Sequence, residues 1–350
     1  MENDKRVAEF RRNPKLEQLL GELNGMLSTC QESVNRRYEN LRFPILLMMG
    51  VPRSGSTLFM QWLAESQCFG YPSNIISRFY VAPYIGARLQ QVLIENDFRN
   101  EITDFKKNVP YESTLGKTQG ALAPHEFWFF WRRFFTLGQN AHVVSPEVLE
   151  QVDVATFKRE LASLEAALEK PLAMKGMFLN WHIPFLDAIF DKVLFVHVKR
   201  DPAYVVQSML ESRQKFFGSE DRWYSVKPPE YEWLKGLAPV KQVAGQVYFV
   251  QKAVEAGIAQ VAESRTLVVN YEQFCETPAV IWEAIRSKMA AQGYALDGYY
   301  KGPRRFEAAN RIRVSSQRWT DIQAALLAIQ QPLRGSPVPA HGAGRVTGTK

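Results

Sequence analysis

The sequence predicts an α/β fold of the P-loop-like kind, with a parallel sheet flanked by helices on both faces. Short apolar runs alternate along the chain with longer segments of helical periodicity, which is typical of parallel sheets. One run is followed by a glycine-containing turn and a helical pattern, an arrangement that binds phosphate groups. The 350 residues are 46% hydrophobic, enough for one large core, and no linker or repeat divides them.

The first part of the chain contains one predicted strand among several helices. Apolar residues that recur at spacings of three and four predict amphipathic helices, and a short continuous apolar run predicts a buried strand. A proline at the start of a helical pattern marks the first turn of that helix. The elements expected here are a helix at 15–38, a strand at 45–49, a helix from Leu58, a helix at 87–95, and an aromatic helix at 127–135 opened by Pro124, His125 and Glu126.

The second part alternates strands and helices more regularly. Short apolar runs again mark the strands, and proline or polar residues mark several helix starts. The elements expected here are a charged helix at 147–169, a strand at 172–175, a helix at 184–190, a strand at 193–198, a helix from Pro202, a long helix at 240–263, a strand at 266–270 and a helix at 277–289.

We expect one domain at 41–330, preceded by an N-terminal helical segment at 1–40 and followed by a flexible tail at 331–350 that is rich in proline and glycine. The three cysteines are scattered and form no C-x-x-C pair, which predicts reduced thiols. No apolar signal-peptide core follows the first residues, and no apolar run approaches the length of a membrane span. These features predict a cytoplasmic protein.

The charge balance favours anionic ligands. The formal net charge is +7, which attracts acidic partners. No long run of lysine and arginine is present, so we expect no nucleic-acid partner. The composition also offers no metal-ligand pattern. We expect the helix at 15–38 to pack beside the first strand or, as an alternative, to form the contact of a homodimer.

The turn Gly50–Thr57 has the most informative sequence of the chain, GVPRSGST. Its glycine spacing fits the nucleotide-binding pattern G-x-x-x-x-G-K-[ST] with one departure. Ser56 stands where the phosphate-binding lysine belongs, and the positive charge lies instead at Arg53. Backbone N–H groups and a helix dipole favour an anion at such a turn. The turn therefore predicts an anion site that is not built for an ordinary nucleoside triphosphate.

A second strand end carries an independent pattern. The apolar run 193–198 ends in Lys199, Arg200 and Asp201, and Ser208 follows eight residues after Arg200. On a helix that begins at Pro202, this serine lies near the same sheet edge as the arginine. Because ligands bind at the carboxyl ends of parallel strands, Arg53 and Arg200 can serve one site.

Together these patterns resemble the sulfotransferases that use 3′-phosphoadenosine 5′-phosphosulfate (PAPS) as sulfuryl donor, in particular bacterial cytoplasmic members. The resemblance implies a sulfotransferase-type fold. It implies that the 5′-phosphate and sulfate are held by Arg53, Ser54, Gly55, Ser56 and Thr57, and the 3′-phosphate by Arg200 and Ser208. The product of the donor would be 3′-phosphoadenosine 5′-phosphate (PAP).

Two later segments extend the resemblance. The segment 268–274 is similar to the family's strand-end Tyr-Glu-Asp segment, which gives Tyr271 the contact to adenine. The segment 314–319 resembles a late Ser-x-x-Arg-Trp segment, in which Ser316 and Arg318 close over the 3′ side of the nucleotide. An ordinary helix N-cap explains this last segment nearly as well.

The resemblance places a leaving-group lysine at Lys175, which lies 25 residues before Arg200 at the end of a short strand. The family's histidine two residues later is replaced by Met177, so the catalytic base stays open. Glu126 is favoured over His125, because a carboxylate half-buried against aromatic rings has a raised pKa suited to accepting a proton. His182, which resembles the family's His-Leu-Pro, is the weakest of the three candidates.

The predicted function is in-line transfer of a sulfuryl group from PAPS to a hydroxyl or amine of a carbohydrate or small-molecule acceptor, without a metal. The segment at 222–229, which includes Trp223 and Tyr224, is a candidate acceptor-side lid. Tyr71 to Asn74 replace a Gly-Glu-Glu segment of tyrosine-sulfating enzymes, which argues against that role. The alternatives are a P-loop nucleotide kinase or NTPase, and a non-catalytic nucleotide-binding module.

Overall fold

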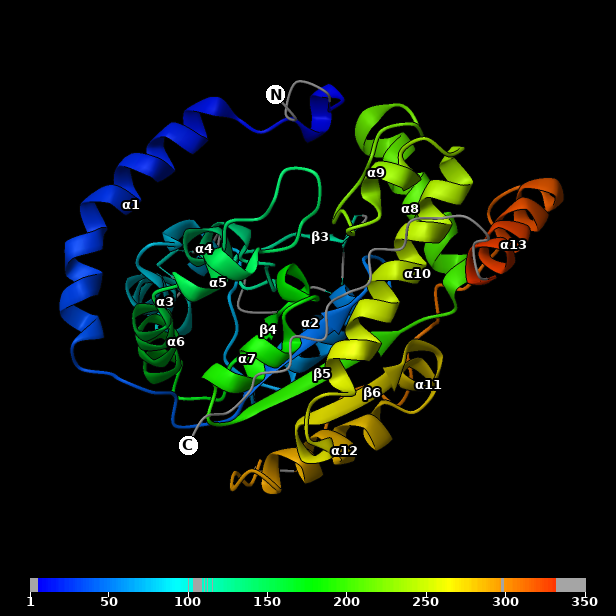
Figure 1. Cartoon of the computed structure of the whole chain (residues 1–350). Coiled ribbons are helices and arrows are strands. Elements are labelled where there is room, and N and C mark those ends of the chain that lie inside the picture. The colour runs from blue at the N-terminus through cyan, green and yellow to red at the C-terminus, as the bar shows by residue number, and fades with distance from the viewer. Residues whose placement is uncertain are drawn as a thin grey trace, which may run out of the picture.

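The computed structural model describes residues 6–99, 101–102, 109, 111, 113–114, 116–296 and 299–331. Its centre is a parallel sheet of four strands in the order β4-β1-β5-β6 (Figure 1). The strands are β1 (Ile45–Gly50), β4 (Ala173–Lys175), β5 (Val193–Lys199) and β6 (Thr266–Asn270), with a separate small hairpin of β2 (Ser113–Thr114) and β3 (Lys117–Thr118). The predicted α/β fold with a parallel sheet is confirmed.

Helices cover both faces of the sheet because the strands β4, β1 and β5 bury apolar side chains on both faces. On β1, Leu47 packs into a core with α4, α6 and α7, whereas Met48 packs into a second core with α2 and α12. Successive side chains of a strand point to opposite faces, so one continuous apolar run supplies both cores. A third core joins α8, α10 and α13 beside the sheet.

The longer helices follow the predicted order. In chain order, the α-helices of the described residues are α1 (Pro14–Asn35), α2 (Ser56–Glu65), α3 (Pro83–Gln90), α4 (Trp128–Phe134), α5 (Pro146–Glu150), α6 (Val154–Leu168), α7 (Ile183–Ile189), α8 (Pro202–Phe217), α9 (Tyr231–Leu234), α10 (Pro239–Ile258), α11 (Tyr271–Glu276), α12 (Pro278–Ala290) and α13 (Ser316–Gln330). Short 3-10 turns lie between several of them, at Ala8–Phe10, Ile76–Phe79, Met177–Leu179 and Glu263–Arg265, and a π-helical turn, Gln91–Glu95, follows α3.

Three helix predictions are corrected. The charged helix expected at 147–169 is two helices, because Asp153 caps a new start by accepting from the Thr156 N–H at 2.9 Å. The long helix expected to reach 263 ends at Ile258. The aromatic helix begins at Trp128, so Pro124, His125 and Glu126 lie before it. Of the predicted tail, residues 332–350 lie outside the described residues.

The parallel register brings the strand ends to one edge of the sheet. Met48 of β1 is opposite Lys175 of β4, and Lys199 of β5 is opposite Asn270 of β6. The chain leaves β1 at Gly50 and β5 at Lys199 on this edge. Within the described part of the chain, no helix combines the length and apolar character needed to cross a membrane.

Candidate active site

The loop after β1 leaves an open helix start at the sheet edge. Gly55 is the N-cap of α2, and no side chain caps that helix. The first N–H groups of a helix have no acceptor within the helix, so those of α2 remain available to an anion. The start of the loop is held by Asn180, whose buried side chain accepts from Gly50 N–H at 3.1 Å and donates to Gly50 O at 2.8 Å.

A glycine is required at position 55 for two reasons, the left-handed backbone conformation and the close approach of Tyr271. Its φ of +93° is in the left-handed region, and a Cβ there would lie 2.2 Å from Cδ2 of Tyr271. The Tyr271 ring therefore packs directly on the loop backbone, and its hydroxyl accepts from the Ala309 N–H at 3.1 Å. The side chain predicted to touch adenine thus fixes the loop against the segment at 309–313.

We expect Gly55→Ala to lower the free energy of unfolding by about 3 kcal/mol, since a left-handed alanine and a forced shift of Tyr271 both cost energy. Urea denaturation followed by circular dichroism measures this loss. The control is Gly25→Ala on α1, where a Cβ meets nothing within 4 Å. That change should be neutral or slightly stabilising. Equal stabilities of the two variants would contradict the tight packing of Tyr271.

Hydroxyl groups line the inner side of the loop. Ser54 Oγ is buried and has no hydrogen-bond partner, an exception among buried polar groups that calls for a ligand. Ser56 is buried in the first turn of α2, and Thr57 Oγ1 accepts from Lys175 Nζ at 3.3 Å. The predicted hydroxyl groups of this loop thus lie beside one lysine and the open helix start.

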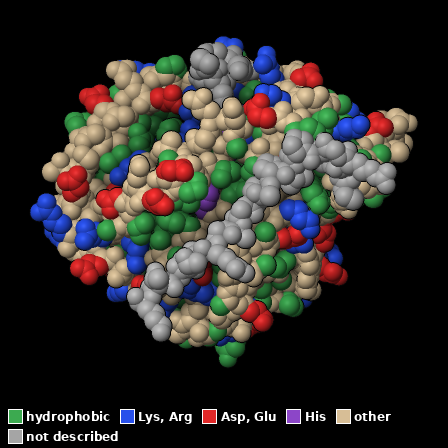
Figure 2. Space-filling model, viewed as in Figure 1, with side chains coloured by type: hydrophobic (Ala, Val, Ile, Leu, Met, Phe, Trp, Pro, Cys, Tyr) green, Lys and Arg blue, Asp and Glu red, His purple; other side chains and the backbone are tan. Residues whose placement is uncertain are grey.

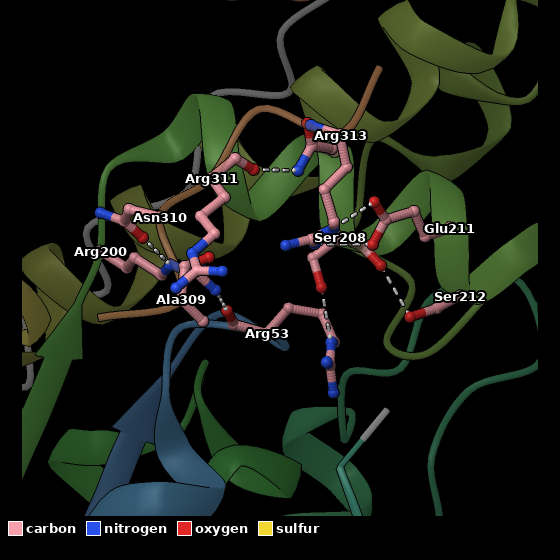
Figure 3. Close-up of polar contacts among 10 residues, drawn as sticks. Arg53, Arg200, Ser208, Glu211, Ser212, Ala309, Asn310, Arg311 and Arg313 are labelled. Carbon is pink, nitrogen blue, oxygen red and sulfur yellow. Dashed lines mark hydrogen bonds and ion pairs between the residues drawn. The ribbon is translucent and has the colours of Figure 1, made fainter. Parts of the chain in front are cut away.

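Arg53 contacts both Ser208 and Arg200, the latter through its backbone oxygen (Figure 3). Arg53 Nε donates to Ser208 Oγ at 3.0 Å, and Arg200 Nη1 donates to Arg53 O at 3.1 Å. Burial first, and then the charge of Arg53 as well, lowers the pKa of Arg200. Three residues predicted from two separate patterns therefore form one cluster, in which two like charges lie close enough to favour an anion between them.

The segment 309–313, which we call the strap, crosses this cluster. Arg200 Nε donates to Asn310 Oδ1 at 2.8 Å, and its Nη2 donates to Ala309 O at 2.7 Å (Figure 3). The other end of the strap is held by α8, where Glu211 accepts from Arg313 Nε at 2.8 Å and Nη2 at 2.7 Å. Arg200 therefore links the loop to the strap.

Lys175 and Glu126 form the other half of the site. Lys175 is buried at the end of β4, and its Nζ lies 3.2 Å from Glu126 Oε1. Trp128 Nε1 donates to the second oxygen of the same carboxylate. The Glu126 side chain keeps 40% of its surface exposed, so a bound molecule can reach the carboxylate.

The expectation of a raised pKa at Glu126 is wrong. Burial does raise the pKa of this carboxyl, but the Lys175 ammonium and the Trp128 N–H outweigh burial and lower it below the ordinary value. The carboxylate is held before α4 because His125 N–H donates to Pro72 O at 2.8 Å and keeps the segment extended. Phe127, with φ of +57°, then turns the chain into α4.

The two candidate histidines each use one ring nitrogen as an acceptor for a backbone N–H. His125 Nδ1 accepts from Phe127 N–H, and His182 Nε2 accepts from Val144 N–H, both at 2.9 Å. Burial lowers the pKa of each imidazole to about 4. Both rings are therefore neutral near pH 7, and the remaining nitrogen of each carries the proton.

Ser316 and Arg318 lie apart from the phosphate cluster. Ser315 caps α13 by accepting from the Arg318 N–H, Ser316 is the first residue of that helix, and Arg318 forms an ion pair with Glu220. In this structure the segment is therefore an ordinary N-cap of α13. The strap just before α13 supplies the cluster contacts instead.

Sequence reasoning missed several residues that shape the site. Asn180 and Asn310 hold the loop and Arg200 by side-chain bonds across the fold, and no local pattern marks them. Gly116 lies on the loop, since a Cβ on it would lie 2.9 Å from Arg53 Nη1. Its φ of +86° suits a glycine, but the only sequence signal was the pair of glycines at 116 and 120.

Comparisons with known proteins identify a family for this chain. A family model described as "Sulfotransferase family" matches residues 44–290, a range that contains the loop, Lys175, Arg200 and Tyr271. A search of curated proteins gave no match.

Several solved structures are similar to this chain. A solved sulfotransferase from Mycobacterium avium has 12% identity, covering 90% of this chain and 86% of that chain with a TM-score of 0.47. The sulfotransferase domain of a Synechococcus olefin synthase has 18% identity, covering 74% and 76% with a TM-score of 0.38. A sulfotransferase from Mycobacterium tuberculosis has 13% identity, covering 75% and 72% with a TM-score of 0.45.

Proposed function

Because this chain belongs to the sulfotransferase family, we propose that it transfers a sulfuryl group from PAPS to a hydroxyl or amine of a carbohydrate or small-molecule acceptor. One observation carries the proposal. Arg53 contacts Ser208, and Arg200 contacts the backbone oxygen of Arg53, beside a helix start that no side chain caps. Such a pair of cationic positions fits a nucleotide with phosphates on both its 5′ and 3′ sides better than a linear triphosphate.

The residues present fit the donor. The open N–H groups of α2 and the unpartnered Ser54 Oγ would hold the 5′-phosphate and the sulfate, with Ser56 and Thr57 beside them. Arg200 and Ser208 would hold the 3′-phosphate, for which the planar guanidinium offers paired N–H donors. Tyr271 would support this end of the site from below, through its contacts with Gly55 and Arg200.

When bound, PAPS supplies the sulfuryl group, whose bond to the acceptor atom forms as its bond to the 5′-phosphate oxygen breaks. Lys175 would stabilise the charge that develops on that phosphate, since its Nζ already lies 3.3 Å from Thr57 Oγ1 in the loop. Glu126, the favoured base, would take the acceptor proton on its exposed carboxylate. His125 and His182 are weaker candidates because each already uses its acceptor nitrogen.

Calorimetric titration with PAP, with adenosine 5′-phosphate and with ATP plus magnesium tests the donor assignment. We expect PAP to bind more tightly than adenosine 5′-phosphate. Arg200→Ala and Ser208→Ala should each weaken PAP binding, Arg200→Ala by about 10- to 100-fold, because a charge-assisted contact to the 3′-phosphate is lost. Both variants should leave adenosine 5′-phosphate almost unaffected. Arg53→Ala should weaken both nucleotides.

Arg286→Ala is the matched control, since that arginine pairs with Glu283 on α12. It should bind PAP like the parent protein. Tight binding of ATP with magnesium, together with indifference to the 3′-phosphate, would overturn the sulfotransferase proposal and favour a P-loop kinase.

A further inference from the structure

The β2–β3 hairpin brings a lysine to the edge of the proposed active site. Gly116, in its turn, lies against the loop, since a Cβ there would be 2.9 Å from Arg53 Nη1 and 3.6 Å from Thr57 Oγ1. Thr118 fixes the hairpin by donating to Pro124 O at 2.9 Å, next to the segment that carries the favoured base. Lys117 therefore lies between two anchored residues of the hairpin. Gly116 contacts the loop, and Thr118 bonds to the segment that carries Glu126.

Lys117 lies between aromatic rings and other cations. Its Nζ is 4.6 Å from the ring centre of Phe10 and 5.1 Å from that of Phe216. Burial, followed by the charges of Arg6 and Arg12, lowers the pKa of Lys117. Among the described residues no carboxylate forms an ion pair with Lys117. Glu9 acts on it only through its charge, and Glu17 pairs with Arg12 at 3.3 Å. Lys117 is an exposed residue beside two arginines, so its ammonium can receive an anion from solution.

The N-terminal segment completes this cluster. Val7 N–H donates to Phe216 O at 3.0 Å, and the Phe10 ring packs edge-on against Phe216 at 4.6 Å. The Arg12 guanidinium lies 5.5 Å from the ring centre of Phe129, which is partly exposed on α4. These contacts hold the segment beside the hairpin, so its arginines belong to the same surface as Lys117.

Tyr224 connects the cluster with the reacting groups. Its ring stacks on Phe216 at 5.3 Å with an interplanar angle of 11°. Burial raises the pKa of its phenol, and the charges of Arg53, Glu126 and Arg6 also act on it. Figure 2 shows a hollow lined by hydrophobic side chains between α1 and the body of the protein. A small pocket in this region is lined by Leu20, His125 and Phe129, among others.

We propose that Lys117, assisted by Arg6 and Arg12, binds an anionic group of the acceptor, and that the acceptor has an aromatic or apolar body that packs near Tyr224 and Phe129. The inference rests on the proposed function and narrows its acceptor class. The anion would be a carboxylate, phosphate or sulfate on a hydroxy or amino compound. A neutral sugar would leave the Lys117 cluster unused, whereas the donor phosphates already have Arg53, Arg200 and Lys175.

Calorimetry on the full chain saturated with PAP tests this inference. The probes are a hydroxynaphthoate and the matching hydroxynaphthamide, which differ in charge and little in shape. We expect the acid to bind about tenfold more tightly than the amide, as is typical of a charge-assisted contact. Lys117→Met should abolish this preference and leave amide binding unchanged, whereas Lys117→Arg should retain it. Lys241→Met, at an exposed position of α10, is the matched control and should keep the preference.

Three results would overturn the inference. The first is equal binding of acid and amide, or no binding of either probe to the PAP complex. The second is a loss of both probes to the same degree in Lys117→Met. The third is a lower affinity of Lys117→Met for PAPS with no change for PAP, which would assign the lysine to the donor's own sulfuryl group. Failure of PAP to bind the parent protein would instead refute the proposed function.

Discussion

Lys175→Met lowers the kcat of sulfuryl transfer by about 10³-fold and changes PAP affinity by only about twofold. The Lys175 ammonium is buried between Thr57 Oγ1 and Glu126 Oε1, at 3.3 and 3.2 Å. A fixed cation in such a place stabilises charge that develops on the leaving phosphate, and water cannot replace it. Methionine keeps the apolar length of the side chain, so the packing of β4 should survive.

Single-turnover kinetics with saturating donor, together with PAP calorimetry, separates these two effects. The matched control is Lys199→Met, which removes another strand-end lysine whose Nζ lies 2.9 Å from Glu255. This control should keep most of the activity. Equal losses in both variants would show that Lys175 acts through the stability of the sheet, and unchanged kcat in Lys175→Met would remove it from the chemistry.

Glu126→Gln should lower kcat/KM by about 10²- to 10⁴-fold, the range for loss of a general base. Glutamine keeps the shape of the side chain and one oxygen that can accept from Trp128 or Lys175, but it cannot take the acceptor proton. Glu255→Gln, which alters the carboxylate paired with Lys199, is the control and should remain active. Parent-like activity of Glu126→Gln would show that Glu126 is not the base and would leave His125 and His182 as the candidates.

The pH dependence of kcat/KM should shift in a defined direction when Lys175 is replaced. Because Lys175 and Trp128 hold the pKa of Glu126 below its ordinary value of 4.5, the carboxylate stays ionised from pH 6 to 8 and gives no acid limb there. Without Lys175, the burial contribution is less opposed, so the pKa rises. The residual kcat/KM of Lys175→Met should therefore fall at a higher pH than that of the parent. An acid limb at the same pH in both would contradict the coupling.

The strands and the loop could be predicted because their signals are local. Continuous apolar runs such as 45–49 and 193–198 become buried parallel strands, and glycine spacing identifies the turn that follows β1. The Arg53, Arg200 and Ser208 cluster followed from two such patterns and the rule that strand ends share one edge. These features needed no knowledge of distant contacts.

The missed features depend on contacts between distant parts of the chain. Asn180 reaches Gly50 across 130 residues, and Asn310 reaches Arg200 across 110. The start of α4 was predicted too early because backbone bonds to the segment around Pro72 keep His125 extended. The pKa of Glu126 was misjudged in direction because its aromatic neighbours are visible in the sequence, whereas Lys175, 49 residues away, is brought near only by the fold.

The pairing of β4 with β1 makes the alignment of two strands part of the proposed catalytic geometry. Ala173 packs in the core on the α2 side of the sheet, and Met174 packs in the core on the opposite side, so Lys175 points toward α2. A slip of β4 by one residue would turn every side chain to the other face and carry the Lys175 ammonium away from the loop. Insertion or deletion of a single residue in β4 would therefore abolish turnover although Lys175 itself is still present. The alternation of side chains along the strand decides on which face of the sheet its ammonium lies.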